Sequence, residues 1–476
     1  MKKFNIYETL RNSANEFPNQ IAVVDEFGEI TYNELFQETE KLIQWFQNKG
    51  VKEGIGVGII TGNNRHFIIC LYAIVACNAI AMPISSKQKP YEIELAVKEG
   101  QIHFIVGDVK DLVALGDSKI EKISSEPTLY FNKTSLSNTK RIAEFIDSPA
   151  FIRFTSGTTG KAKGVIISHV SVLERINAAN ESLKITSDDK ILWVLSMAYH
   201  FVVSIVLYIK NGATIIVNND FMAEEIIASI QKYSATFFYG SPMHISMLAA
   251  SKTKVMLPTL RTVISTTTGV SASVCVDFYN RYKIPVRQAF GIIEVGLPII
   301  NSDSSNNPEA VGFALPAYRV AIMDENFKPL ENNKLGLLCV SGPGMFDGYL
   351  SPPTKREKVL KNGWFITGDI AVMNDNGLIT IKGRKKNVIN VQGNKVFPNE
   401  VEEVINCFDG VIKSKAYASK HLLLGEVVAV DIESRKSLDK EEVISFCRKS
   451  LSSFKLPQII NFVDEIKMTD SGKIKR

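Results

Sequence analysis

The sequence predicts a large α/β domain followed by a small α+β domain. A chain of 476 residues is too long for one ordinary hydrophobic core, so two or three domains are expected. Between residues 5 and 300, short apolar runs alternate with helical patterns, which indicates mainly parallel sheets covered by helices on both faces. After residue 310 the pattern changes to short strands separated by turns. We therefore expect a domain at residues 1–385 that ends in a β subdomain, and a second, small domain at residues 386–476.

The first 150 residues are expected to start one sheet of the large domain. Residues 110–149 are polar and rich in serine and lysine, so we expect an exposed excursion there. The elements before it are predicted as an amphipathic helix from about residue 5, two strands around a turn at Gly28, a helix capped by Gly50, a strand at 54–60, helices at 64–77 and about 91–99, and a strand at 102–108.

From residue 170 to 300 the alternation of strands and helices returns and predicts a second sheet in the same domain. Two uncharged stretches, 67–84 and 191–209, approach the length of a membrane-spanning helix. Polar residues interrupt both of them, so we interpret them as buried helices of a large core. The interrupting residues are Asn78 and Pro83 in the first stretch, and Ser196, Tyr199, His200 and Ser204 in the second.

Composition limits the class of partner. The net charge is +5 with no basic block, which suits an anionic substrate and does not suggest nucleic-acid binding. Six cysteines are scattered without a CxxC pair, so reduced thiols fit better than a disulfide or metal framework. The N-terminus lacks the apolar core of a signal peptide, and we expect a cytoplasmic protein without a membrane span.

The most informative stretch is residues 151–169, FIRFTSGTTGKAKGVIISH. Two apolar runs of strand type flank a loop rich in glycine, hydroxyl groups and lysine, which predicts a hairpin. Glycines allow backbone N–H groups to turn towards an anion, hydroxyls add donors, and lysines supply positive charge, as a phosphate-binding loop requires. The loop is not a Walker A motif, because Ala162 follows Gly160-Lys161 and the next predicted element is a strand.

The segment TSGTTGKAKG resembles the phosphate loop of the adenylate-forming superfamily, which contains acyl- and aryl-CoA synthetases, adenylation domains of peptide synthetases, and luciferases. Ala162 stands where that family usually has proline. ITYNEL and AIAMPIS resemble its opening motifs. The resemblance implies that ATP phosphates contact Thr155, Ser156, Gly157, Thr158, Thr159 and Lys163.

The segment AFGIIEVG at 289–296 resembles the family's aromatic-Gly-x-Thr-Glu motif. The resemblance implies that Phe290 stacks on adenine beside Gly291, and that Glu294 holds Mg²⁺ as a hard oxygen ligand. Ile293 stands where the family usually has threonine, so a hydroxyl that would contact the α-phosphate is missing.

The segment 362–404 carries two further motifs of the same family. Trp364-Phe365-x-Thr367-Gly368-Asp369 resembles the motif whose aspartate binds both ribose hydroxyls. Gly383-Arg384-Lys385-Lys386 resembles the hinge motif, in which Arg384 contacts ribose or phosphate and Lys386 is the hinge residue. Residues 393–402 resemble the loop that helps to form the pantetheine tunnel in thioester-forming members.

The C-terminal SGKIKR resembles the motif that carries the catalytic lysine of adenylation, which is Lys473 here. An ammonium group at that point would stabilise the negative charge that develops in the transition state. In the same family the segment that corresponds to 195–204 ends in an aromatic residue or histidine at the carboxylate pocket, so the resemblance implies that His200 borders this pocket, with a core histidine as the alternative. The segment 195–204 contains no acid that could hold an ammonium group, which favours an aryl or aliphatic acid over an α-amino acid.

Taken with the resemblance, these motifs predict a ligase that uses ATP and Mg²⁺ to convert a small carboxylic acid into an acyl adenylate and then into a CoA thioester. Two alternatives stay open. One is a stand-alone adenylation enzyme that loads an aryl or acyl group onto the phosphopantetheine of a carrier protein. The other is a non-catalytic nucleotide-binding homologue, which the substitution at Ile293 makes conceivable.

Overall fold

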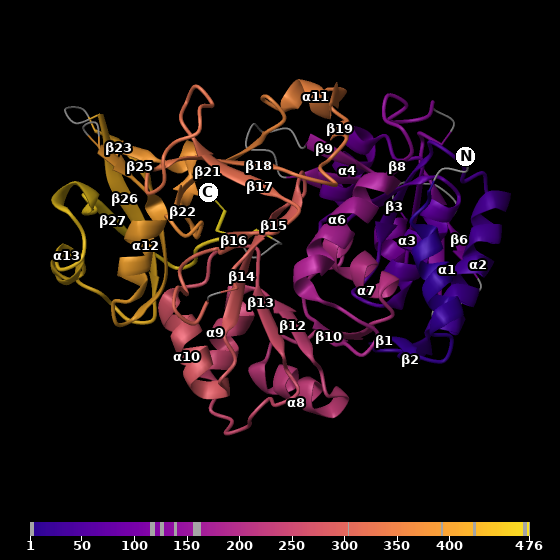
Figure 1. The fold of residues 1–476 in the computed structure, drawn as a ribbon, viewed down its shortest axis with the longest axis horizontal. Coiled ribbons are helices and arrows are strands. Elements are labelled where there is room, and N and C mark those ends of the chain that lie inside the picture. Colours follow the sequence, from indigo (N-terminus) through magenta and orange to yellow (C-terminus); the bar gives the residue numbers. More distant parts are fainter. Residues whose placement is uncertain are drawn as a thin grey trace.

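The computed structural model describes residues 4–114, 120–123, 128–137, 140–155, 163–302, 304–391, 394–421, 425–469 and 474–475. The named strands of this part form four sheets. Two nine-stranded sheets build the large N-terminal domain, a four-stranded sheet follows them, and a smaller sheet contains the last strands of the chain. The C-terminal elements form a lobe at the left of Figure 1, and the first helices lie at the opposite end. The predicted α/β domain with a smaller α+β domain is confirmed.

The first nine-stranded sheet has the order β20-β19-β9-β8-β4-β3-β5-β7-β6. Only its central pairs are parallel, because β6–β7 and β8–β9 are antiparallel hairpins. The strands are β3 (Gly56–Ile60), β4 (Ile80–Pro83), β5 (Phe104–Gly107), β6 (Glu121–Ile123), β7 (Leu129–Lys133), β8 (Pro149–Thr155), β9 (Lys163–Ser168), β19 (Gly348–Tyr349) and β20 (Thr354–Lys355).

The second nine-stranded sheet has the order β16-β15-β14-β13-β12-β10-β11-β1-β2, and its run from β14 to β1 is parallel, as predicted. The strands are β1 (Ile21–Asp25), β2 (Gly28–Thr31), β10 (Lys190–Trp193), β11 (Thr214–Val217), β12 (Phe237–Gly240), β13 (Thr262–Ser265), β14 (Val286–Ile292), β15 (Gly296–Ile300) and β16 (Phe313–Ala314).

Helices cover these sheets and bury the main core. The helix α3 (Arg65–Ala76) is buried along almost its whole length, which explains its nearly uncharged sequence. Thr31 and Glu34 form a capping box at the start of α2 (Tyr32–Asn48), and Gly50 follows its C-terminal end with a φ of 89°, as predicted. The other helices of this domain are α1 (Tyr7–Glu16), α4 (Pro90–Gly100), α5 (Lys110–Val113), α6 (His169–Leu183), η1 (Phe201–Ile205), α7 (Val206–Lys210), α8 (Ala223–Tyr233), α9 (Pro242–Ala250), α10 (Ala272–Tyr282) and α11 (Arg356–Val359).

Two sequence predictions are wrong in part. Residues 110–149 are not only an exposed excursion, because β7 pairs with β5 and the apolar side chains Leu129 and Phe131 are buried. Alternation over a few residues was enough to extend the sheet at this edge. The stretch 191–209 is not one helix but β10, a turn, η1 and α7, since the polar residues fall where the chain leaves the strand. Within the described residues, no helix is long and apolar enough to cross a membrane.

The remaining elements form the β subdomain and the C-terminal lobe. The β subdomain consists of β17 (Arg319–Met323), β18 (Gly336–Ser341), β21 (Phe365–Met373) and β22 (Ile379–Arg384). The buried residues of one apolar cluster, from Ile389 to Ile460, form the core of the lobe. The boundary between residues 385 and 386 stays a prediction. The elements of the lobe are η2 (Lys385–Asn387), β23 (Ile389–Val391), β24 (Asn394–Val396), α12 (Pro398–Asn406), β25 (Val411–His421), β26 (Gly425–Ser434), α13 (Lys440–Arg448), η3 (Ser453–Lys455) and β27 (Ile459–Val463).

The buried His169 at the start of α6 makes the stability of this fold sensitive to acid. Its Nδ1 accepts a hydrogen bond from the Ile6 N–H at 3.2 Å, and burial lowers the pKa of His169 to about 4. Between that value and the ordinary 6.5, the unfolded chain binds a proton that the folded chain does not. Stability is therefore lost as the pH falls, by about 2 kcal/mol at pH 5 from this residue. Urea unfolding of wild type and His169→Gln at pH 7.5 and 5.0 checks this: the variant should lose less stability between the two pH values, and equal losses would contradict the assignment.

Candidate active site

The predicted phosphate-loop hairpin is present. Strands β8 and β9 pair antiparallel, with Thr155 opposite Lys163 at the end of the ladder. Lys163 is exposed, and its ammonium nitrogen lies 5.0 Å from the centre of the Tyr349 ring. The loop residues Ser156, Gly157, Thr158 and Thr159, and the side chain of Thr155, lie outside the described part of the chain, so their predicted phosphate contacts stay predictions.

Glu294 lies in the turn between β14 and β15 and is held from the segment that contains β19. Its backbone carbonyl accepts a hydrogen bond from the Phe346 N–H at 2.7 Å, and its Oε1 accepts one from the Tyr349 hydroxyl at 3.2 Å. Burial, followed by the charge of Glu294 and this hydrogen bond, raises the pKa of Tyr349, so the hydroxyl keeps its proton and remains a donor. The Tyr349 hydroxyl therefore orients the Glu294 carboxylate, and the Lys163 ammonium group lies over the ring of Tyr349.

Arg175 of α6 supports the same turn from behind. Its Nη1 donates to the Ile293 carbonyl at 3.0 Å and its Nε donates to the Gly344 carbonyl at 2.7 Å. The residue is 1% exposed, and burial lowers its pKa to about 10, so it stays charged at neutral pH. The side chain of Ile293 packs against the main core. Arg175 could not be singled out from the sequence, because one arginine on an amphipathic helix is typical of a solvated face.

Phe290 and Gly291 lie on β14 next to this turn. Phe290 is half-buried against a small apolar cluster that contains Ile299 and Leu338. At Gly291 a Cβ atom would lie 2.9 Å from the Gly296 carbonyl oxygen, so the close approach of the two strands requires glycine. Stacking of Phe290 on adenine stays a prediction.

The structure brings Asp369 and Arg384 together, as neighbours on β21 and β22. Arg384 Nε lies 2.8 Å from Asp369 Oδ1, and its Nη1 donates to the Thr367 carbonyl at 2.9 Å. The Thr367 hydroxyl oxygen accepts a hydrogen bond from the Asp369 N–H at 3.0 Å. Asp369 and Arg384 belong to two different motifs, and both motifs were predicted to contact the ribose. The two residues form one charged unit, in which the carboxylate is largely buried.

Two further predicted site residues, the hinge residue Lys386 and the catalytic residue Lys473, follow Arg384 in the sequence. Lys386 is exposed in the short turn η2, between the last strand of the β subdomain and the first strand of the lobe. Its neighbour Lys385 is exposed beside Glu325 at 3.5 Å, as a solvated lysine would be. Lys473 lies outside the described residues. The roles of Lys386 as a hinge and Lys473 as the catalytic lysine stay predictions.

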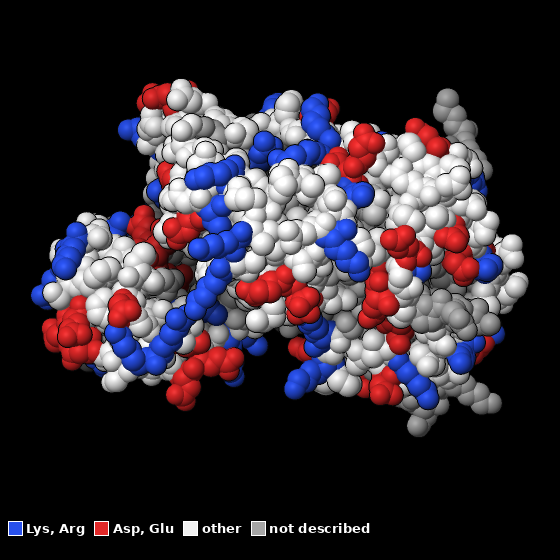
Figure 2. Space-filling model, turned by 90° about the horizontal axis from the view of Figure 1, so that it is seen from below, with Lys and Arg blue, Asp and Glu red and all other residues white. Residues whose placement is uncertain are grey.

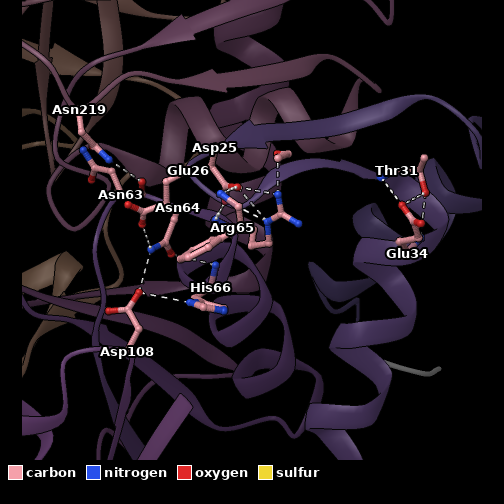
Figure 3. A network of polar contacts seen from close by, with 12 residues as sticks. Asp25, Glu26, Thr31, Glu34, Asn63, Asn64, Arg65, His66, Asp108 and Asn219 are labelled. Carbon is pink, nitrogen blue, oxygen red and sulfur yellow. Dashed lines mark hydrogen bonds and ion pairs between the residues drawn. The ribbon is translucent and has the colours of Figure 1, made fainter. Parts of the chain in front are cut away.

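The predicted acid-pocket segment is anchored by Asn63, which precedes α3. Asn63 Nδ2 donates to the Leu195 carbonyl at 3.0 Å, and its Oδ1 accepts from the Met197 N–H at 2.9 Å. Figure 3 shows Asn63 beside Asn219, whose Nδ2 donates to the Asn63 backbone carbonyl. Next along the segment, the half-buried His200 has a backbone N–H that donates to the Ser196 carbonyl at 3.1 Å. Its role at the pocket stays a prediction.

Tyr199 and Arg153 connect this segment to the phosphate-loop hairpin. Arg153 lies on β8, two residues before Thr155, and its guanidinium carbon lies 5.3 Å from the centre of the Tyr199 ring. The negative charge of Glu294 also acts on this guanidinium. Arg153, Arg175 and Tyr349 are the site residues that sequence reasoning missed.

Comparisons with known proteins identify the family of this chain. The family model of AMP-binding enzymes matches residues 10–350, and the model of their C-terminal domain matches residues 400–473. A long-chain-fatty-acid–CoA ligase of Yersinia pestis is 25% identical, over 99% of this chain and 93% of the relative. The putative acyl–CoA ligase YdaB of Bacillus subtilis is 26% identical, over 94% of this chain and 93% of the relative.

Solved structures share the fold over nearly the whole chain. The o-succinylbenzoate CoA synthetase MenE of Bacillus subtilis, in complex with the acyl adenylate OSB-AMP, has a TM-score of 0.87 at 19% identity, with 100% of this chain and 97% of that chain covered. ATP-bound MatB of Rhodopseudomonas palustris has a TM-score of 0.84 at 22% identity, with 99% and 97% covered. From the matched family models, the chain belongs to the family of AMP-binding enzymes.

Proposed function

We propose that this protein is an ATP-dependent acid–thiol ligase, which joins a carboxylic acid to AMP with release of pyrophosphate and then transfers the acyl group to CoA. The observation that carries the proposal is the pair of matches to both domains of the AMP-binding enzymes, with relatives named as CoA ligases along almost the full chain. The oriented carboxylate of Glu294 and the Asp369–Arg384 unit supply the polar groups that the first step needs.

In the first step, the protein's main task is to hold two anions together in a reactive geometry. The Asp369 carboxylate would accept hydrogen bonds from the ribose hydroxyls, with Arg384 fixing its orientation at 2.8 Å. Phe290 would cover the adenine, and Lys163 with the loop at 155–159 would bind the phosphates. Figure 2 supports a small anionic ligand: on this face, Lys and Arg side chains form a line near the C-terminal lobe at the left, whereas both signs mix elsewhere.

The residues at Glu294 fit a magnesium ion bound together with the nucleotide. Mg²⁺ is usually held by one or two carboxylates plus substrate phosphates, and Glu294 is one oriented carboxylate. Among the described residues there is no group of three or more His, Cys, Asp or Glu side chains that could form a complete metal cage. When bound, the ion would neutralise charge on the phosphates. Glu294 would hold it, and Tyr349 would keep the carboxylate in position.

Tyr349→Phe tests this arrangement. Loss of the 3.2 Å hydrogen bond should leave the carboxylate less well oriented and raise the Mg²⁺ concentration for half-maximal adenylation by about tenfold, since hydrogen bonds to charged groups contribute about 1.5–3 kcal/mol. Titration of Mg²⁺ in an ATP–pyrophosphate exchange assay measures it. The exposed Tyr279, on α10, offers a matched control as Tyr279→Phe. An unchanged Mg²⁺ requirement in Tyr349→Phe would contradict the role given to this pair.

In the second step, we propose that the unit at 386–476 turns about Lys386 relative to the domain at 1–385, so that the segment 393–402, which contains β24 and the start of α12, reaches the acyl adenylate. The thiol of CoA would then attack the acyl carbon and release AMP. The short turn η2 between two strands suits a hinge, because an exposed lysine can change its φ and ψ without exposing core. We also propose a cytoplasmic location, supported by six free cysteines.

The experiment that tests this function is a product assay with ATP, Mg²⁺, a panel of aryl and aliphatic acids, and either CoA or a phosphopantetheinyl carrier protein. Mass spectrometry should detect an acyl-CoA and AMP in the CoA reactions. Acyl transfer to the carrier protein alone would favour the stand-alone adenylation enzyme. ATP binding without any product in either series would favour a non-catalytic homologue, which Ile293 makes conceivable.

A further inference from the structure

Arg153 is a half-buried cation that the proposed reaction scheme does not use. Its Nε is buried and has no hydrogen-bond partner among the described residues. Burial lowers the pKa of Arg153 to about 10 against the attraction of Tyr199 and Glu294, so the guanidinium is charged at neutral pH. Buried donors are almost always paired, and a buried charge without a partner is costly. Such a group is retained where a ligand completes it.

The surroundings of Arg153 point to the ligand. The residue lies on β8, whose next residues lead into the phosphate loop, and its guanidinium lies 5.3 Å from the ring of Tyr199, next to His200. Phe151, two residues earlier on the same face of β8, makes an edge contact with Phe201 at 4.9 Å between ring centres. Arg153 therefore faces the segment predicted to border the acid. Asp369 and Arg384, which are predicted to contact the ribose, lie on β21 and β22 and not on β8.

Arg175 shows by contrast that burial alone does not explain Arg153. Arg175 is buried and Arg153 is half-buried, the charge of Glu294 acts on both, and desolvation lowers both pKa values to about 10. Arg175, however, donates from Nε and Nη1 to two backbone carbonyls, which is a structural role, and only its Nη2 lacks a partner among the described residues. The Nε edge of Arg153 has no such acceptor, and that edge, together with one Nη, is the geometry that binds a carboxylate with two parallel hydrogen bonds.

We propose that Arg153 is a substrate-binding residue whose guanidinium binds a carboxylate of the acid. The inference rests on the proposed function and deepens it, because it names a binding group for the acid. That carboxylate is either the one that reacts or a second one on the same molecule. If it is the reacting group, Arg153 orients every substrate. If it is a second group, Arg153 selects dicarboxylic acids.

The test compares wild type with Arg153→Met, Arg153→Lys and the control Arg11→Met. Arg11 stacks on Tyr7 at 4.8 Å in α1, so its loss removes an arginine–tyrosine contact remote from the site. ATP–pyrophosphate exchange is measured with matched mono- and dicarboxylic acids, and thermal unfolding is measured without ligand. Arg153→Met should raise the half-saturating acid concentration at least tenfold and leave that of ATP within twofold. The half-saturating acid concentration of Arg153→Lys should lie between those of wild type and Arg153→Met. Arg11→Met should match wild type.

The stability measurement separates a binding role from a structural one. Because the buried Nε of Arg153 has no partner among the described residues, ligand-free Arg153→Met should unfold at a temperature no lower than wild type. If Arg153→Met raises the half-saturating concentration of dicarboxylic acids alone, Arg153 binds the second carboxylate. If it raises that of all acids, Arg153 binds the carboxylate that reacts. A lower unfolding temperature with unchanged acid saturation, or a rise in half-saturation for ATP only, would overturn the proposal. If wild type itself shows no exchange, the proposed function fails first, and equilibrium binding of the acids to wild type and Arg153→Met still tests the arginine.

Discussion

Replacement of Lys473 by alanine is expected to reduce ATP–pyrophosphate exchange by about a hundred- to a thousand-fold, the usual cost of removing one group that stabilises transition-state charge. During adenylation, negative charge develops between the acid carboxylate and the α-phosphate, and an ammonium group there lowers the barrier. Thioester formation from supplied acyl adenylate should persist, because the thiol attacks a carbonyl whose leaving group is already in place. The two half-reactions are measured separately, by pyrophosphate exchange and by acyl-CoA formation.

Lys475→Ala is the matched control for this prediction. Lys475 is two residues away and exposed, and its backbone N–H donates to the Lys467 carbonyl at 2.9 Å, a contact that alanine preserves. Exchange by this variant should stay close to that of wild type. Equal loss of both half-reactions in Lys473→Ala would remove the catalytic assignment, since it would indicate a general defect of the C-terminal lobe.

The second large effect concerns stability. Arg65→Met is expected to lower the free energy of unfolding by about 3–5 kcal/mol, because it leaves a buried carboxylate without its counterion. Arg65 Nη2 lies 2.6 Å from Asp25 Oδ1, with the Asp25 side chain fully buried, and the same nitrogen donates to the Gly28 carbonyl (Figure 3). This pair joins the start of α3 to the end of β1. Urea unfolding at neutral pH measures the loss.

The exposed pair Lys41–Glu38 provides the comparison. Its two charges lie 2.7 Å apart, but the side chains are 71% and 39% exposed, so Lys41→Met should change the free energy of unfolding by at most about 1 kcal/mol. The double variant Asp25→Asn/Arg65→Met should recover part of the stability, because no unpaired charge remains. Similar losses in Arg65→Met and Lys41→Met would contradict the importance given to burial.

Local patterns predicted the fold well where neighbouring residues determine the structure. The hairpin at 151–169 followed from two apolar runs around a glycine-rich loop, and β8 and β9 pair as expected. Asp369 and Arg384 were each identified by their motif, and the pairing of β21 with β22 brings them together. The stretch 191–209 was misjudged because a continuous apolar run fits a buried helix and a buried strand equally well.

Residues that act across long sequence separations could not be predicted. Arg175 supports Glu294 through a carbonyl 118 positions away, and Tyr349 contacts that glutamate from 55 positions away. Arg153 was visible only as a charge inside an apolar run, and its importance depends on Tyr199, which lies on another segment. In each case a single polar residue is ambiguous until the fold shows what lies beside it.

If this chain forms an acyl adenylate, it should catalyse ATP–pyrophosphate exchange, measured across aryl, short-, medium- and long-chain acids, dicarboxylic acids and α-amino acids. We expect exchange that depends on one class of aryl or aliphatic acid and on Mg²⁺, with no response to α-amino acids. Exchange driven by an α-amino acid would contradict the substrate class. Absence of exchange with every acid, by a folded protein that binds ATP, would contradict adenylation itself.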